Sequence, residues 1–188
     1  PAWDAATRPG DLARYVVPSD VDSRIQIPQD GSVSRRQRLE LLWERFREHR
    51  IEYAWEPRGS VPGAQWIRQP DLVLEDPKVG TCLDLALVFA AACTQASLRS
   101  AVIALAPADG TDGASVGHAV VAVLLGDAET WPGGDPVDGV WLQTPEAFAG
   151  QVRDGLSGSS RPVVVLDPVG FAHEVPVRFG LNPRPGLN

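Results

Sequence analysis

Residues 80–96 read GTCLDLALVFAAACTQA and predict the element around which the rest of the chain is built. Thr81 is a favourable helix N-cap, and the apolar positions after it recur at helical spacing on one face: Cys82, Leu85, Ala86, Phe89, Cys93 and Ala96. The remaining positions are also mostly apolar, and Asp84 is the only charge between Thr81 and residue 96. A helix that is apolar all round is buried. We therefore expect a central helix over residues 81–96.

Other segments predict the elements around this helix. Residues 34–50 form an amphipathic helix, because Ser34 and Gln37 fit a capping box and apolar residues recur at i, i+3, i+4 and i+7 in Leu39, Leu42, Trp43 and Phe46. A shorter helix is expected after Pro70, and another over residues 144–154. Apolar runs predict strands at 51–55, 101–105, 118–125 and 162–167. This mixture of helices and strands indicates an α+β fold.

Composition excludes several classes of protein. The chain has 188 residues, 44% of them hydrophobic, which suits one domain with a sizeable core. Its net charge of −7 argues against a nucleic-acid partner, and two cysteines do not make a disulfide scaffold. No apolar run reaches the roughly 18 residues of a membrane helix and no signal peptide is visible, so we expect a cytoplasmic protein with no membrane partner. The chain contains no Met, which fits either removal of an initiator Met or a piece of a larger multidomain protein.

Three residues with catalytic potential stand at the edges of predicted elements. Cys82 begins the central helix, His118 begins a strand and Asp167 ends a strand. A thiol at a helix N-terminus lies at the positive end of the helix dipole, which favours the nucleophilic thiolate. A histidine beside it can exchange the proton with a leaving amine, and a carboxylate can orient the imidazole. This order of residue types predicts a Cys-His-Asp triad.

Four segments resemble the transglutaminase-like superfamily of papain-fold cysteine enzymes, most closely its bacterial transglutaminase-like domains. Residues 80–91 match the nucleophile helix, which begins Gly-x-Cys with an acidic residue two positions later. Residues 67–74 match the segment upstream of it. Residues 117–121, GHAVV, stand where the family has its His-Ala strand, and 164–168, VVLDP, resemble the closing strand that ends in Asp-Pro. The resemblance extends over about residues 15–170.

The resemblance implies a papain/transglutaminase-like core, in which the central nucleophile helix packs on an antiparallel sheet. With the sequence pattern, it divides the chain into three parts. Proline-punctuated residues 1–33 are read as an N-terminal arm, extended or made of short strands and packed rather than free. A transglutaminase-like domain (34–181) and a flexible, Pro- and Gly-containing tail (182–188) follow. Two departures stand out. Val120 occupies a position that is aromatic in many members, so an aromatic wall over the site has to come from elsewhere, with the candidates Trp66, Trp131 and Trp141. Val169 follows the Asp-Pro pair where the family often has Thr.

Further residues are assigned secondary roles. Gln65 is the expected oxyanion-hole donor, with the Trp66 indole N–H as the alternative. Asp84 is expected to be structural, and Cys93, about 16 Å along the same helix, is expected to be a core residue. His173 is a rival catalytic base. The spacing of Cys and His residues predicts no metal site, and no cofactor is expected.

Two functions follow. The first is acyl transfer by a cysteine nucleophile on a peptide or carboxamide of a protein or peptide substrate. Water as the acceptor makes the enzyme a protease or amidase, whereas an amine makes it a transglutaminase. The second is a non-catalytic peptide-binding or interaction module that retains the fold within a larger protein.

Overall fold

The computed structural model describes residues 2–4, 9–22, 24–25, 33–54, 64–105, 117–126, 131 and 163–174. Within these ranges the chain mixes helices and strands, so the fold is α+β. Several sequence-based expectations lie outside the described residues: the helix at 144–154, Trp141 and the tail 182–188.

The central helix is α4 (Cys82–Gln95), as the apolar pattern predicts. Every residue from Cys82 to Cys93 is buried, including the charged Asp84. Thr81 caps the helix as expected, and its hydroxyl accepts a hydrogen bond from the Asp84 backbone N–H at 3.3 Å. Because α4 is apolar on all sides, neighbouring elements must cover it all round, and this requirement organises the rest of the fold.

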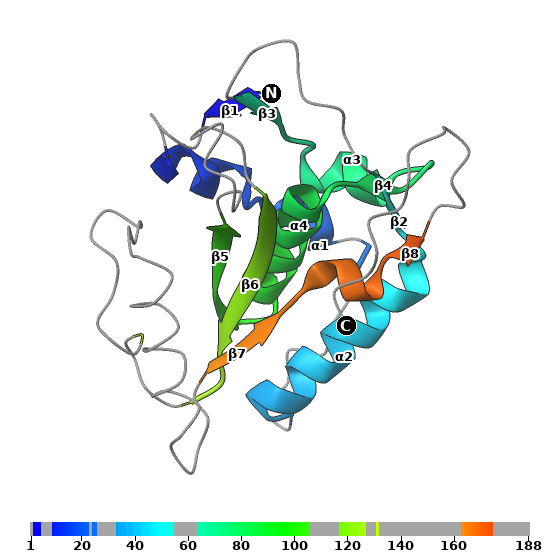
Figure 1. Cartoon of the computed structure of the whole chain (residues 1–188). Coiled ribbons are helices and arrows are strands. Elements are labelled where there is room, and N and C mark those ends of the chain that lie inside the picture. The colour runs from blue at the N-terminus through cyan, green and yellow to red at the C-terminus, as the bar shows by residue number, and fades with distance from the viewer. Residues whose placement is uncertain are drawn as a thin grey trace.

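One face of α4 packs on an antiparallel sheet of strand order β5-β6-β7, comprising β5 (Arg99–Leu105), β6 (His118–Leu124) and β7 (Val163–Leu166). Figure 1 shows α4 lying along β5 and β6, with β7 at the outer edge. Ala119, Val121 and Val123 of β6 are fully buried in the core that contains α4. The antiparallel arrangement brings the start of β6 and the end of β7 to the same end of the sheet.

A second small sheet departs from the expected architecture, because its pairings are parallel. Its strands are β2 (Glu52–Tyr53), β4 (Val79–Gly80) and β8 (His173–Glu174), in the order β4-β2-β8. The sequence predicted the strand at 51–55, where β2 lies, but no strand at the positions of β4 and β8 and only antiparallel pairing. Strands of two residues carry no readable periodicity, and their partners are distant in the chain. Gly80 lets β4 run close to α4, since a Cβ there would lie 3.3 Å from side-chain atoms of Val73, Asp84 and Leu85.

The N-terminal segment is only partly extended. β1 (Ala2–Asp4) pairs antiparallel with β3 (Ala64–Trp66), and the Trp3 side chain, 3% exposed, belongs to the main core. The chain then forms a 3-10 helix, η1 (Pro9–Tyr15), and a short helix, α1 (Ser19–Asp22). The expected extended conformation is therefore wrong over most of 9–22. Helices this short hold too few residues to reveal a period in the sequence.

Helix α2 (Arg35–His49) closes the opposite side of α4 from the sheet (Figure 1). Its Trp43 and Phe46 meet Phe89 of α4 and Phe171 of η2 (Pro168–Phe171), a short 3-10 helix directly after β7. The ring centroids lie 4.8–5.8 Å apart, a separation at which aromatic pairs add stability beyond simple burial. This aromatic cluster ties the end of β7 to the central helix.

The predicted capping box of α2 is present and gives a stability test. The Ser34 hydroxyl accepts from the Gln37 backbone N–H at 3.3 Å, and the Gln37 side-chain oxygen accepts from the Ser34 backbone N–H at 3.0 Å. Ser34→Ala is expected to lower the free energy of unfolding by about 1 kcal/mol, measured by urea denaturation. Ser34→Asp, which retains a cap acceptor, should stay close to the wild type. Equal stability of the Ala variant and the wild type would show that the cap contributes nothing.

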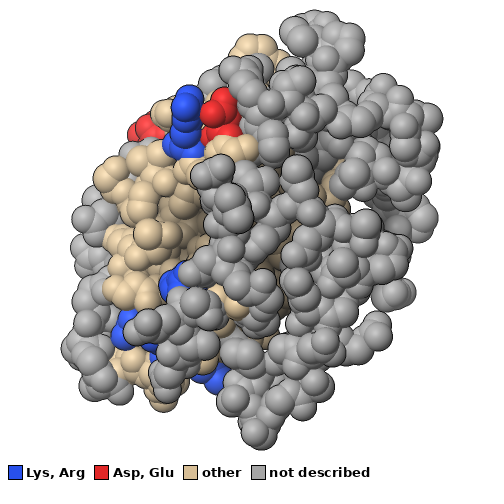
Figure 2. Space-filling view, turned by 90° about the vertical axis from the view of Figure 1, so that its left-hand side faces the viewer, with Lys and Arg blue, Asp and Glu red and all other residues tan. Residues whose placement is uncertain are grey.

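The described surface carries no dominant charge pattern on the face shown in Figure 2. Most of the described residues there are uncharged, and Lys, Arg, Asp and Glu side chains form small groups at its borders. Of the helices in the described part of the chain, none combines the length and the apolar character needed to cross a bilayer.

Candidate active site

Cys82 is the first residue of α4, and its side chain is 7% exposed. Backbone N–H groups in the first turn of a helix have no partner within the helix, so they are free to bind other acceptors. The Leu83 N–H donates to the Cys82 sulfur, and so does the Ala119 N–H of the neighbouring strand β6. The thiol is thus held between the start of α4 and the start of β6.

His118 and Asp167 meet at the same end of the sheet. His118 is the first residue of β6, and Asp167 follows the last residue of β7. The His118 Nε2–H donates to Asp167 Oδ2 over 2.8 Å, and the other carboxylate oxygen, Oδ1, accepts from the Val169 backbone N–H at 3.0 Å. A carboxylate only accepts, so the hydrogen bond places the ring proton of a neutral imidazole on Nε2. Nδ1 is then the ring nitrogen able to take a proton.

A backbone hydrogen bond from β6 connects the Cys82 thiol to the strand that carries His118. Ala119, whose N–H donates to the Cys82 sulfur, is the residue directly after His118. Asp167 also lies near enough for its negative charge to act on the thiol. The fold therefore gathers three residues that are far apart in the chain at one end: Cys82, His118 and Asp167. His118 and Asp167 side chains are 35% and 52% exposed, so this end opens to solvent at the pair.

Burial raises the pKa of the Cys82 thiol above its ordinary value. The hydrogen bonds from Ala119 and Leu83 oppose that rise in pKa, and the negative charges of Asp84 and Asp167 add to it. The sequence led us to expect a thiolate favoured by the helix dipole. In the folded chain burial outweighs the two N–H donors, so the thiol keeps its proton at neutral pH unless a base removes it. His118, the residue before the Ala119 N–H donor, is the candidate for that base.

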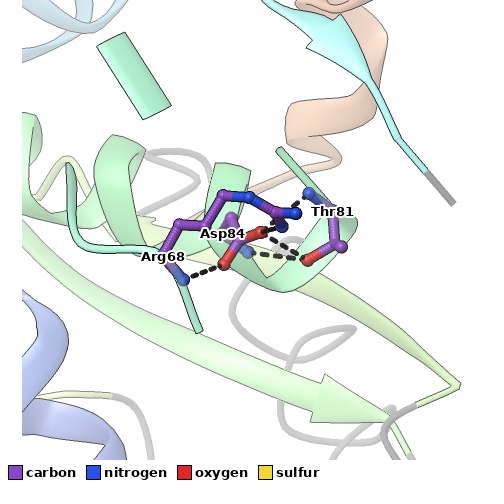
Figure 3. Close-up of polar contacts among 3 residues, drawn as sticks. All are labelled: Arg68, Thr81 and Asp84. Atoms are coloured by element: carbon purple, nitrogen blue, oxygen red, sulfur yellow. Dashed lines mark hydrogen bonds and ion pairs between the residues drawn. The ribbon is translucent and has the colours of Figure 1, made fainter. Parts of the chain in front are cut away.

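Asp84, two residues after Cys82, is fully buried and held from three sides (Figure 3). Its Oδ2 accepts from the Thr81 backbone N–H and hydroxyl, both at 2.9 Å, and from Arg68 Nη1 at 2.8 Å. Its Oδ1 accepts from the Arg68 backbone N–H at 2.8 Å. Asp84 was expected to be structural, but its partner Arg68 was not predicted. A carboxylate in an apolar helix needs a cation, and that requirement was the available signal.

The remaining candidates take different places. Gln65 and Trp66 lie on β3, where Gln65 pairs with Trp3 of β1. The Trp66 residue is 51% exposed. The thiol's hydrogen-bond donors given above are backbone groups and come from neither residue. Gln65 and Trp66 remain predictions for the oxyanion hole, two to three residues upstream of Arg68.

Three further residues complete the set. Cys93 is fully buried in the core, as expected, and burial raises the pKa of its thiol strongly. Trp131 is 8% exposed and packs on the sheet with Ala122, Leu124 and Val163. His173, the rival base, lies on β8 beside Glu52 of β2. Across the described ranges, no group of His, Cys, Asp and Glu side chains is arranged to hold a metal ion.

No family model, curated protein or solved structure matched the chain. The case for a function therefore depends on the geometry of Cys82, His118 and Asp167 and on the sequence resemblance.

Proposed function

We propose that the chain is a transglutaminase-like cysteine enzyme that transfers acyl groups from peptide or carboxamide substrates, with Cys82 as nucleophile, His118 as base and Asp167 as the residue that orients His118. The observation that carries the proposal is the 2.8 Å His118–Asp167 hydrogen bond beside the Cys82 thiol at the start of α4. A papain-like core, with a nucleophile helix against an antiparallel sheet, is the finer fold assignment that goes with it.

The proton has a defined route in this proposal. Asp167 fixes the Nε2–H tautomer, so Nδ1 of His118 accepts the Cys82 proton as the sulfur attacks the substrate carbonyl carbon. The raised pKa of the buried thiol makes this transfer necessary at neutral pH. The N–H groups at the start of α4, together with Gln65 or the Trp66 indole, are the candidate donors to the oxyanion.

The second half of the reaction releases the product. The carbon–nitrogen bond breaks, the imidazolium of His118 gives its proton to the departing amine, and a thioester with Cys82 remains. Water then attacks the thioester to give an acid, or a second amine attacks to give a new amide. Both routes restore the Cys82 thiol. Exposure of the His118–Asp167 pair supports access for water, and so favours hydrolysis.

The second candidate function is a non-catalytic peptide-binding module, and the burial of the thiol favours it. Cys82 is 7% exposed, and burial raises its pKa, as expected for an inert structural cysteine. The two candidates differ in what His118 does to the thiol. A base that takes the thiol proton makes Cys82 react at neutral pH, whereas a structural cysteine stays slow.

Iodoacetamide alkylation at pH 7 separates the two functions. The enzyme predicts that Cys82, located by peptide mass spectrometry, is alkylated faster than a free thiol such as glutathione, and the buried Cys93 serves as the internal slow control. A peptide mixture incubated with the protein and an amine probe is then scored for cleavage, glutamine deamidation and amine incorporation. Slow alkylation of Cys82 together with no change in the peptide mixture would leave the binding module as the function.

Replacing Asp167 tests the orienting role. Asp167→Ala removes the acceptor of the Nε2–H, and we expect turnover to fall by about 10²-fold, within the range that a positioned acid–base group contributes. Asp167→Asn keeps an acceptor oxygen and should retain more activity than the Ala variant. Because Asp167 also caps η2, thermal unfolding of both variants is measured alongside. Full activity in a folded Asp167→Ala variant contradicts the role.

A further inference from the structure

An ion pair between Arg68 and the buried Asp84 lies at the first turn of α4, two residues after the candidate nucleophile Cys82. The Asp84 carboxylate is 0% exposed, and the only strong positive charge bonded to it in the described contacts is the Arg68 guanidinium at 2.8 Å. A carboxylate removed from water is stable in its charged form when it is paired and hydrogen-bonded. The two N–H groups and the hydroxyl that complete its surroundings satisfy the second requirement.

Arg68 holds both oxygens of the carboxylate at once. Its backbone N–H donates to Oδ1 and its Nη1 donates to Oδ2, so the side chain folds back over Asp84 toward Thr81 (Figure 3). The Arg68 side chain is 33% exposed, while that of Asp84 is fully buried. These two hydrogen bonds join the segment after β3 to the first turn of α4.

The same turn presents the nucleophile. Asp84 forms the capping box with Thr81, and Cys82 and Leu83 are the two residues between them. The Leu83 N–H donates to the Cys82 sulfur. Any movement of Asp84 therefore changes the direction of that donor, and any change in the net charge at Asp84 is felt at the sulfur through a short, water-poor path.

We propose that Arg68 is a positioning residue for Cys82: through Asp84 it fixes the first turn of α4 and cancels the negative charge closest to the nucleophile along the chain. The inference rests on the proposed function, because it gives Arg68 a role only if Cys82 reacts. A purely structural ion pair would stabilise the fold without altering the chemistry of the sulfur.

Other charges around the sulfur are accounted for separately. Asp167, after β7, is paired with His118 of β6. The two residues of β4 carry no titratable side chain, and Asp71 of α3 (Pro70–Leu74) accepts from the Leu72 N–H within its own helix. Arg99 begins β5 at the opposite end of the strand from Leu105, the residue that pairs with His118. Among these groups, the Asp84–Arg68 pair can be altered without touching the His118–Asp167 hydrogen bond.

The test compares the two halves of the ion pair. The rate of iodoacetamide alkylation at Cys82 is followed from pH 5 to 10 for the wild type, Arg68→Met, Arg68→Lys, Asp84→Asn and the double variant Arg68→Met/Asp84→Asn. Arg68→Met leaves the carboxylate unbalanced, so the inflection should move to higher pH by about one unit, which is about tenfold in thiolate fraction. Asp84→Asn removes the carboxylate and should move it to lower pH. Arg68→Lys and the double variant should lie close to the wild type.

The opposite directions separate positioning from mere stability. Loss of a structural ion pair lowers the unfolding temperature in both single variants and moves their inflections, if at all, in the same direction. Unmoved inflections in folded Arg68→Met and Asp84→Asn variants, or shifts of the same sign, overturn the proposal. If Arg68→Met does not fold, the fall in inflection pH of Asp84→Asn and the wild-type behaviour of Arg68→Lys decide it. A wild-type Cys82 that reacts no faster than glutathione, together with an unchanged peptide mixture, refutes the proposed function instead, so the two failures are distinguishable.

Discussion

Cys82→Ala is expected to abolish acyl transfer, with turnover falling by about 10⁴-fold or more, because in the proposed mechanism the sulfur forms the covalent intermediate. His118→Ala should lower turnover by about 10²- to 10⁴-fold. The turnover of both variants is measured on a peptide that the mass-spectrometric screen identifies as a substrate. Cys93→Ala is the matched control, since it removes the other thiol from the same helix, and it should retain turnover at a cost in stability.

The same variants predict a change in pH dependence. Burial raises the pKa of the Cys82 thiol, so without His118 the fraction of thiolate at pH 7 becomes smaller than that of an ordinary cysteine. In His118→Ala the alkylation rate at Cys82 should therefore be low at pH 7 and climb only as the pH approaches and passes the raised pKa. The wild type should already react at neutral pH. Identical rate–pH curves for the two proteins would mean that His118 does not take the thiol proton.

Phe89→Ala is expected to have the largest effect on stability, lowering the free energy of unfolding by about 3–5 kcal/mol. Phe89 is fully buried on α4, and its ring meets Trp43, Phe46 and Phe171. Truncation removes buried ring surface and leaves a cavity that three other rings cannot fill. Urea denaturation measures the loss.

Leu72→Ala is the control for this prediction. Leu72 lies on α3 and is 53% exposed, so its truncation should change the unfolding free energy by no more than about 0.5 kcal/mol. A Phe89→Ala variant that loses as little as Leu72→Ala would show that the aromatic cluster is not part of the stabilising core.

The long helices of this fold could be predicted because their apolar residues recur at helical spacing over several turns. The apolar face of α4 and the Ser34–Gln37 capping box of α2 are local signals, and both match the structure. A strand was predicted at 51–55, where β2 lies, but the two-residue strands β4 and β8 could not be predicted, since each is defined by pairing with a distant segment. The 3-10 helix η1 and the short α1 were likewise too brief to leave a period.

The candidate site divides in the same way. That Cys82, His118 and Asp167 stand at the ends of elements can be inferred from local sequence, and antiparallel pairing of β6 with β7 then brings two of them together. Two further features depend on three-dimensional packing and could not be predicted. They are the hydrogen bond from the Ala119 N–H to the Cys82 sulfur and the use of Nε2 rather than Nδ1 of His118 to bind Asp167. Arg68 was missed for a related reason: burial of Asp84 requires a cation, but sequence alone does not choose one among the chain's arginines, and the partner lies 16 residues away.

The η2 helix connects the Asp167 carboxylate to the aromatic cluster of the core. Asp167 caps η2, and Phe171 at its other end is 3% exposed among the rings of α2 and α4. Cooperative units of a protein open together. Because η2 is anchored at Phe171, we expect the hydrogen bond from His118 to Asp167 to be lost when the core opens rather than by local fraying, although the Asp167 side chain faces solvent.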